Sequence, residues 1–331
     1  MTDRRQFIHA LAALAAPAAL VPRAVQAQSA PPVKQLTLVV PFPAGGATDA
    51  VARLLAEHAL RGAYAENVVV ENRAGAGGRI GVEYVKQRPA DGATLLYTPA
   101  FPIAIFPHIY RRLPYDAMAD FVPVAASAKG MLGLAVGPAV PATVTKLADF
   151  VAWCKANPSK SNFGTGSGSG QHFAGVTFAH AAGFDLRLVP YKGGAPAVVD
   201  LLGGHISSTV SPLPEIMPHA AEGKLRILAV TGRQRSRFLP QEPTMVELGY
   251  PDIVFQDWSG VLAPAKTTPE LVARANAAIS TYVRSDKGVE ALAKVGTEAD
   301  AQNVPEFAAT VKASWERYRE IVKATGFTAD D

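Results

Sequence analysis

The chain has 331 residues, and its 32 Lys and Arg against 28 Asp and Glu give a formal net charge of +4. So small an excess excludes the strongly basic surface by which nucleic acids and anionic membranes are recognised. Cys154 is the only cysteine, which excludes an internal disulfide, and its setting after Phe150, Val151 and Trp153 predicts a buried thiol rather than a reactive one.

Residues 1–27 have the pattern of an export signal: a charged start, an uncharged apolar stretch over 7–21 and a small-residue end at 25–27. Arg4-Arg5-Gln6-Phe7-Ile8 also fits the twin-arginine pattern. No later segment reaches a membrane-spanning length. We therefore expect a soluble mature protein in the periplasm, whose remaining about 300 residues predict two domains.

Short β-rich runs alternate with helical patterns along the mature chain. This alternation indicates βαβ units, an α/β fold and mostly parallel sheets. A barrel of eight βα units is the alternative, but the strands are too few and too irregularly spaced for it. The predicted strands are Leu36–Val40, Val68–Val70, Thr94–Tyr97, Leu132–Val136, Leu186–Val189, Ile206–Val210 and Leu225–Val230, with a further one ending near Phe163.

Three helices are predicted with particular clarity. The first follows residue 46, with one apolar face. The second begins at Thr268-Pro269, with threonine as the cap and proline in the first turn. The third begins near Pro305. The apolar face of the first carries Val51, Leu54, Leu55 and Ala59, and the stripe of the third carries Phe307, Val311, Trp315, Tyr318 and Val322.

Two glycine loops stand between a strand and a helix. Gly45-Gly46 ends the loop after the first strand, and Gly164 to Gly170 repeats the arrangement in the middle of the chain. Free backbone N–H groups and the positive helix end favour an anion at such a place. Two loops, one from each domain, are expected to hold one carboxylate or one dicarboxylic acid between them.

A third loop, Gly75-Ala76-Gly77-Gly78, ends the second strand, and its glycines are explained by the turn itself. Glu71 mimics the acidic residue of a dinucleotide fold. However, residues 41–46 do not match G-x-G-x-x-G, and no phosphate-binding G-x-x-x-x-G-K-[ST] is present. The sequence therefore does not predict a nucleotide or any other cofactor.

Three polar side chains near these loops keep more than one interpretation. Asp49 either stabilises the first turn of its helix or accepts a hydrogen bond from a ligand. Lys192 either pairs with an acidic group of the ligand or is solvated. His172, directly behind the second glycine loop, is either a satisfied helical histidine or a ligand contact.

Motifs for catalysis or for metal binding are missing from the sequence. There is no G-x-S-x-G, no S-x-x-K, no H-E-x-x-H and no cysteine pair. We predict no catalytic residue and no metal ligand. The competing classes are an exported enzyme acting on a small organic acid and the effector domain of a transcription regulator; the export signal and the lack of a helix-turn-helix argue against the latter.

Ordered motifs over nearly the whole mature chain resemble the Bug-type extracytoplasmic solute receptors of tripartite tricarboxylate transporters. These motifs are Val40-Pro41-Phe42-Pro43-Ala44-Gly45-Gly46 with Thr48-Asp49, Val70-Glu71-Asn72-Arg73, Asp91-Gly92-Ala93-Thr94-Leu95-Leu96, Leu113-Pro114-Tyr115-Asp116, Val189-Pro190-Tyr191-Lys192-Gly193-Gly194-Ala195-Pro196-Ala197, Asp200-Leu201-Leu202-Gly203-Gly204 and Leu228-Ala229-Val230-Thr231.

The resemblance implies a two-domain, type II periplasmic binding protein fold, a Venus flytrap with a ligand cleft between its lobes. Domain 1 would be residues 28–127 plus 241–331, and domain 2 residues 128–240. The protein would be a monomer that binds a small carboxylate and passes it to the membrane subunits of a transporter. The ligand-binding residues carried over from the family are Phe42, Ala44, Gly45, Gly46, Ala47, Thr48, Asp49, Thr165, Gly166, Ser167, Gly168 and Ser169. Besides these we expect Thr98, Pro99, Ala100, His172, Tyr191, Lys192 and Ser211 to contact the ligand.

The sequence departs from the family pattern in three places. Ala47 stands where serine is common, so one side-chain contact is lost. The loop over 163–172 is one residue shorter than usual, so assignments there can slip by one position. The segment over 98–102 is apolar for a cleft and favours an aromatic or otherwise hydrophobic acid.

Overall fold

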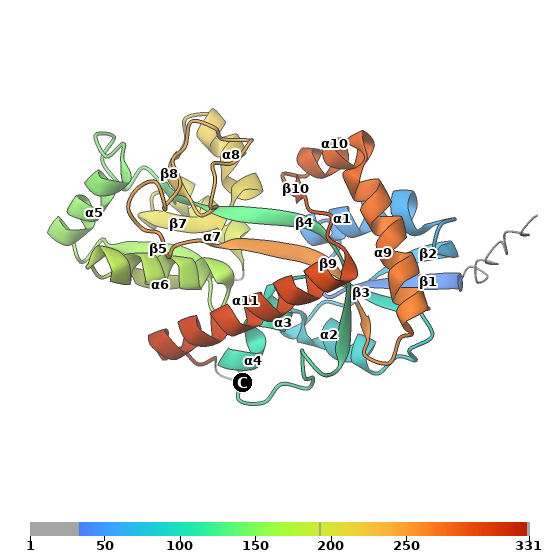
Figure 1. The fold of residues 1–331 in the computed structure, drawn as a ribbon. Coiled ribbons are helices and arrows are strands. Elements are labelled where there is room, and N and C mark those ends of the chain that lie inside the picture. The colour runs from blue at the N-terminus through green and yellow to red at the C-terminus, as the bar shows by residue number, and fades with distance from the viewer. Residues whose placement is uncertain (1–32, 192, 330–331) are drawn as a thin grey trace, which may run out of the picture. The chain divides into compact units, whose positions relative to one another are not determined.

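A computed structural model describes residues 33–191 and 193–329 of the protein (Figure 1). The predicted export signal and Lys192 lie outside the described residues. Within those residues, no helix is both long enough and apolar enough to cross a membrane.

The strands and helices alternate through most of the chain. The strands are β1 (Val33–Val40), β2 (Ala65–Asn72), β3 (Thr94–Pro99), β4 (Phe121–Val136), β5 (Asn162–Gly166), β6 (Arg187–Tyr191), β7 (Ser208–Pro212), β8 (Arg226–Val230), β9 (Gln256–Pro264) and β10 (Glu298–Ala299). The helices are α1 (Ala47–Leu55), the π-helix η1 (Ala56–Leu60), the 3₁₀-helix η2 (Ala76–Gly78), α2 (Arg79–Lys86), α3 (Phe101–Ala104), α4 (Phe106–Ile109), α5 (Leu147–Ala156), α6 (Gly170–Ala182), α7 (Gly194–Leu202), α8 (Leu213–Ala221), α9 (Pro269–Arg284), α10 (Asp286–Lys294) and α11 (Val304–Thr325).

The strands pair in the order β2-β1-β3-β9-β4-β7-β5-β6, with β8 and β10 added beside β4. β1 pairs with β2 and β3 in parallel, and β5 pairs with β6 and β7 in parallel. The parallel pairing expected from the βαβ pattern therefore holds for these six strands. The expectation did not include the antiparallel pairings that β4, β8, β9 and β10 make.

β4 belongs to two sheets. Its first part, Phe121 to Met131, pairs with β9, and its second part, Leu132 to Val136, pairs with β7 (Figure 1). The change of partner falls between Met131 and Leu132, inside one continuous strand. The predicted domain limit at residue 127 lies within the same strand, and the limit at 240 lies between β8 and β9.

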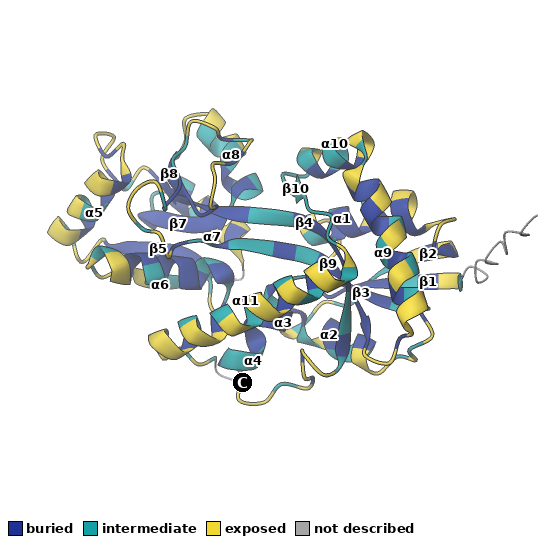
Figure 2. Ribbon diagram, viewed as in Figure 1, coloured by how far each residue is buried: buried dark blue, intermediate teal, exposed yellow. Residues whose placement is uncertain are grey.

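Helices cover both faces of each sheet, as side-chain alternation along the strands requires. In β1, Leu38 packs in one core cluster with Ile279 of α9, whereas its neighbour Val39 packs in another with Phe307 of α11. In β4, Leu134 and Ala135 likewise enter different clusters. Figure 2 shows the buried strands and the one-sided burial of the covering helices.

The helix starts read from the sequence are correct. Thr268 Oγ1 accepts from the Leu271 N–H at the start of α9. Asn303 and Glu306 form a capping box at the start of α11, one residue before the predicted Pro305. Of the predicted α11 stripe, Trp315 is only half-buried and packs against the ring of His108, while its other members are buried.

Candidate functional site

The register of β4 brings the carboxyl ends of two groups of strands toward each other. Pro99, at the end of β3, lies opposite Ser259 of β9, which lies opposite Ala128 of β4. Pro212, at the end of β7, lies opposite Leu132 of β4. The carboxyl ends of β1, β2 and β3 and those of β5, β6 and β7 therefore meet around residues 128–132. Ligands of open α/β sheets bind at such carboxyl edges.

The first glycine loop leaves β1 at this edge and enters α1. Ala44 to Ala47 are exposed, and Thr48 is half-buried. Gly45 has φ +86°, which a side chain rarely adopts, whereas Gly46 has φ −77° and needs no glycine for its backbone. A Cβ at Gly46 would meet only the Pro43 oxygen at 3.8 Å. The missing side chain at Gly46 therefore leaves space in front of the helix.

Asp49 holds this loop from within. Its carboxylate accepts from the Gly45 N–H at 2.8 Å, from Arg53 Nε at 2.9 Å and from Asn72 Nδ2 at 2.9 Å. Asn72 Nδ2 also donates to the Phe42 oxygen at 3.0 Å. The side chain is only 3% exposed. These contacts favour the structural interpretation of Asp49.

The electrostatics of Asp49 agree with this role. Burial raises the pKa of its carboxyl, but the hydrogen bonds from Arg53, Gly45 and Asn72 outweigh burial and lower it. No side chain among the described residues caps the N-terminus of α1. The first N–H groups of α1 therefore keep their capacity to meet an anion.

Aromatic rings line the chain beside the first loop. The Phe42 and Phe101 ring centroids lie 5.4 Å apart, and the row continues to Phe106 at 5.5 Å and then to Tyr110 at 5.1 Å. Phe42 and Phe101 are half-buried. The edge next to the first loop is therefore apolar.

The predicted residues at the end of β3 lie behind this row. Thr98 and Ala100 are buried, and Pro99 is half-buried. Thr98 Oγ1 donates to the Pro99 oxygen, and the Ala100 N–H donates to the Trp258 oxygen at 3.0 Å. These contacts order the backbone that presents Phe101.

The third glycine loop supports the same row. Gly77 and Gly78 both have positive φ. A Cβ at Gly77 would lie 3.2 Å from the Phe106 ring, and one at Gly78 would lie 3.1 Å from the Phe42 ring. These glycines therefore serve the turn and the close approach of two rings.

The second glycine loop joins β5 to α6 at the opposite edge. Ser169 is the N-cap of α6: its Oγ accepts from the His172 N–H at 3.3 Å and donates to the Gly166 oxygen at 2.6 Å. Gly168 has φ +72° and packs beside Ile109 and Phe327, while Ser167 follows β5 directly and is exposed. The loop is thus ordered by its own hydrogen bonds.

His172 is a buried, neutral side chain. It is 6% exposed, lies against Phe163, Phe173 and Phe327, and accepts at Nδ1 from the Gly168 N–H at 3.3 Å. Burial lowers the pKa of the ring to about 4. His172 therefore orders the loop as a hydrogen-bond acceptor.

Asp257 of β9 lies against the start of α6. It accepts from the Tyr318 hydroxyl at 2.8 Å, and a Cβ at Gly170 would lie 2.7 Å from its Oδ2. Burial raises the pKa of Asp257, against the opposing effects of Tyr318 and Arg317. Gly170 is therefore required where α6 meets β9.

The remaining predicted residues lie along the second edge. Thr165 is fully buried, and its Oγ1 has no hydrogen-bond partner among the described residues. Ser211 is also buried, with its Oγ 3.0 Å from Thr209 Oγ1. The Tyr191 hydroxyl donates to Asp200 Oδ2 of α7 at 2.6 Å, so its proton is already used in a hydrogen bond within the protein. Lys192 lies outside the described residues.

Sequence reasoning did not single out Asn72 and Arg53 as residues that hold the first loop. Arg53 follows Asp49 by four positions on α1, a spacing that favours an ion pair, so this contact had a signal. Asn72 stands at the end of another strand, and only the parallel pairing of β1 and β2 brings it there.

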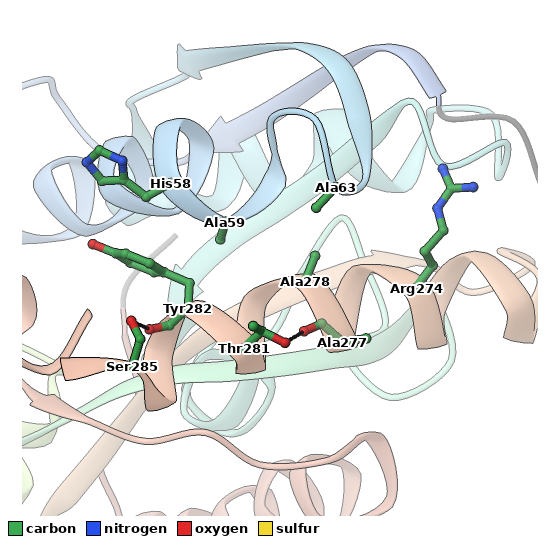
Figure 3. A pocket seen from close by; sticks show the side chains of 9 residues that line it. All are labelled: His58, Ala59, Ala63, Arg274, Ala277, Ala278, Thr281, Tyr282 and Ser285. Carbon is green, nitrogen blue, oxygen red and sulfur yellow. Dashed lines mark hydrogen bonds between the residues drawn. The ribbon is translucent and has the colours of Figure 1, made fainter. Parts of the chain in front are cut away.

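A pocket elsewhere on the protein opens between η1 and α9 (Figure 3). The rings of His58 and Tyr282 stand at one end and Arg274 at the other, with alanines between them. None of the predicted ligand-binding residues that the structure describes lines it. Nor do the described residues contain a group of His, Cys, Asp and Glu side chains suited to a metal ion.

Comparison with known proteins places these observations in a wider group. Residues 51–327 match the model of the family described as "Tripartite tricarboxylate transporter family receptor". Protein BugT of Bordetella pertussis is 35% identical over 297 residues, which cover 89% of this chain and 90% of that protein.

Two solved structures are similar over their whole length. Rpa4515 of R. palustris, solved with adipate, is 33% identical with a TM-score of 0.81 and covers 90% of this chain and 99% of its own. The periplasmic binding protein BugD is 30% identical with a TM-score of 0.78 and covers 91% and 100%. The fold is therefore that of the two-lobed α/β binding proteins of this type.

Proposed function

Because the chain belongs to the tripartite tricarboxylate transporter receptor family, we propose that it is a periplasmic receptor that captures a small carboxylate and delivers it to the membrane subunits of such a transporter. Its relatives are solute-binding receptors, and one of them was solved with adipate. The observation that supports the proposal is that the two glycine loops follow strands whose carboxyl ends face each other around residues 128–132.

The first loop supplies the first half of the proposed carboxylate site. Its exposed backbone precedes the uncapped N-terminus of α1, and Gly46 adds no side chain to the space in front. Backbone N–H groups at a helix start bind carboxylates without a cationic side chain. The Asp49 network then serves to keep these N–H groups in place before the ligand arrives.

The second loop supplies the other half. It lies at the N-terminus of α6, and Ser169 and His172 fix its backbone. Thr165 Oγ1, buried without a partner among the described residues, is suited to a hydrogen bond with the ligand or with a water that accompanies it. Leaving such a hydroxyl unpaired costs about 1–3 kcal/mol, which a ligand contact would recover.

The two halves would close on the ligand as lobes. Domain 1 would be residues 28–127 plus 241–331 and domain 2 residues 128–240, with the bending placed in β4 and in the chain before β9. Ligand preference for the closed form would set the extent of closure. The protein would work as a monomer, without a cofactor or metal, after removal of its export signal.

The apolar row from Phe42 to Tyr110 bears on the kind of carboxylate. Half-buried rings next to the carboxylate-binding loop favour a ligand whose remaining part is apolar. Among dicarboxylates, tricarboxylates, amino acids and aromatic acids, the row favours an acid with an aromatic or aliphatic body.

A melting-temperature screen of the mature protein tests the receptor function. The panel contains mono-, di- and tricarboxylates, amino acids and aromatic acids, with neutral sugars as controls. A ligand at 100 times its dissociation constant should stabilise the protein by about 2.7 kcal/mol. A shift with neutral solutes but with no carboxylate would contradict the carboxylate site.

The alternative is an exported enzyme acting on a small organic acid. The enzyme and the receptor are distinguished by incubating the purified protein with each stabilising acid and following the amount of acid by mass spectrometry. A receptor returns the acid unchanged. Turnover above that of a heat-denatured sample would overturn the receptor proposal.

A further inference from the structure

Glu215 is a half-buried residue near the carboxyl ends of β5, β6 and β7, and one of its carboxylate oxygens, Oε2, is buried. It belongs to the first turn of α8, which follows β7 directly. Its carboxyl lies against Gly194, the first residue of α7, so closely that a Cβ at Gly194 would collide with its Oε2. Glycine at position 194 therefore leaves the room that the Glu215 side chain occupies.

This carboxyl has no partner within the described residues. Oε2 is buried and makes no hydrogen bond there. Burial raises the pKa of Glu215 to about 7. An unpaired buried carboxyl is unfavourable, because it has lost its hydrating water without gaining a donor.

Other carboxylates of the chain make a clear contrast. Asp49 is buried, but three donors surround its carboxylate. Glu222, at the end of α8, is exposed and pairs with Lys224 at 2.6 Å. Glu215 thus differs from Asp49 in having no donor among the described residues, and from Glu222 in having a buried carboxylate oxygen.

Glu215 also lies close to the second glycine loop. A Cβ at Gly166 would lie 3.7 Å from the backbone of Gly193, and Gly193 precedes the Gly194 that touches Glu215. Glu215 is therefore linked to Gly166 through the Gly193-Gly194 backbone at the end of β6. A ligand held at the second loop would have this backbone between it and the start of α8.

We propose that Glu215 determines specificity by accepting a hydrogen bond from an ammonium group of the bound carboxylate. The inference rests on the proposed receptor function and narrows it to amino acids with an apolar side chain. The carboxylate would meet the glycine loops, the ammonium would meet Glu215, and the side chain would face Phe42 and Phe101. An ammonium gives a charge-assisted hydrogen bond to a carboxylate, whereas a second ligand carboxylate would be repelled there.

Matched ligand pairs test the inference by calorimetry. Phenylalanine is compared with 3-phenylpropionate and leucine with 4-methylpentanoate, since each pair differs only in the amino group. At about pH 8, above the pKa of Glu215 near 7, the wild-type protein should bind the amino acids about tenfold or more tightly than their partners. Glu215→Gln should remove most of this preference.

Glu222→Gln is the control, because it removes an exposed carboxylate directly after the same helix and should leave the preference unchanged. Melting curves of both variants separate folding from binding. A Glu215→Gln protein with an altered melting temperature and an unaltered preference would show a purely structural carboxyl, which overturns the inference.

The remaining outcomes separate this inference from the receptor function. If wild-type protein binds the deaminated acids as tightly as the amino acids, the role of Glu215 is refuted and the carboxylate receptor stands. If no member of either series and no other carboxylate binds, the receptor function fails, and the role of Glu215 fails with it.

Discussion

Asn72 Nδ2 lies 2.9 Å from Asp49 Oδ1 and 3.0 Å from the Phe42 oxygen, so one amide group at the end of β2 fixes both ends of the loop that follows β1. The parallel pairing of β1 with β2 places Asn72 opposite Val40, immediately before that loop. The geometry of the proposed carboxylate site thus depends on a residue outside the loop itself.

Replacing Asn72 should loosen the first loop and destabilise the protein together. Asn72→Ala removes the donor shared by Asp49 and Phe42, and we expect a loss of about 1–3 kcal/mol in the free energy of unfolding. Urea unfolding measures the loss, and ligand titration should show weaker binding. Asn67→Ala, exposed on the same strand, is the control, and an equal loss in both variants would contradict the role of Asn72.

The two glycines of the first loop should respond differently to valine. At Gly45, with φ +86°, valine should cost about 1–2 kcal/mol of stability through backbone strain. At Gly46 the backbone is ordinary and the space in front is open, so Gly46→Val should change stability by less than about 0.5 kcal/mol. The Gly46→Val protein should nonetheless lose most of the ligand-induced rise in melting temperature. Equal losses of folding and binding would mean that Gly46 serves the turn alone.

His172 should weaken the fold as the pH falls. Burial lowers its pKa to about 4 from an ordinary 6.5, so between these values the unfolded chain binds a proton that the folded protein does not. Its contribution to stability is present above about pH 6.5 and is lost as the pH falls through 4. Unfolding free energies of His172→Gln should therefore fall less over this range than those of wild type. His180→Gln, exposed on the same helix, should follow the wild type.

Glu215 should act in the opposite direction. Its pKa is raised from 4.5 to about 7 in the folded protein, so its contribution is fully present below about pH 4.5 and is lost as the pH rises through 7. In Glu215→Gln this decline should be absent, and the variant should gain stability relative to wild type as the pH rises. A difference that stays constant between pH 4.5 and 7 would show that the Glu215 carboxyl is solvated.

Cys154 should be inert in the folded protein. The side chain is 1% exposed, and burial raises the pKa of the thiol to about 11 against a weaker effect of Ser161. Thiolate is the reactive form, so a thiol-specific reagent at about pH 8 should modify Cys154 only after unfolding in denaturant. Rapid modification of the native protein would contradict this burial.

Much of the fold is predictable because its signals are local. The strands of the βαβ units, the start of α9 at Thr268 and the buried stripe of α11 follow from short sequence patterns. β9 and the first part of β4 do not. They pair with each other across more than a hundred residues, as between Ala128 and Ser259, and no local pattern records that distance.

The candidate site shows the same division. The glycine loops were predictable, since small residues between a strand and a helix have a known use. The isolation of Glu215 was not, because a first-turn glutamate is ordinarily explained by the helix dipole. The packing of α8 against the start of α7 removes solvent from Glu215 Oε2, and no donor among the described residues replaces it.

The position of β9 between β3 and β4 has a consequence for synthesis of the chain. The sheet of β5, β6, β7, β8 and the second part of β4 has all its strands once residue 230 has left the ribosome. The sheet of β1, β2, β3 and the first part of β4 lacks its central strand, β9, until residue 264 has been made. The middle of the chain can therefore fold first, while β1, β2 and β3 wait for a partner that arrives late. Although the first glycine loop is made before the second, it is the later of the two to reach its final support.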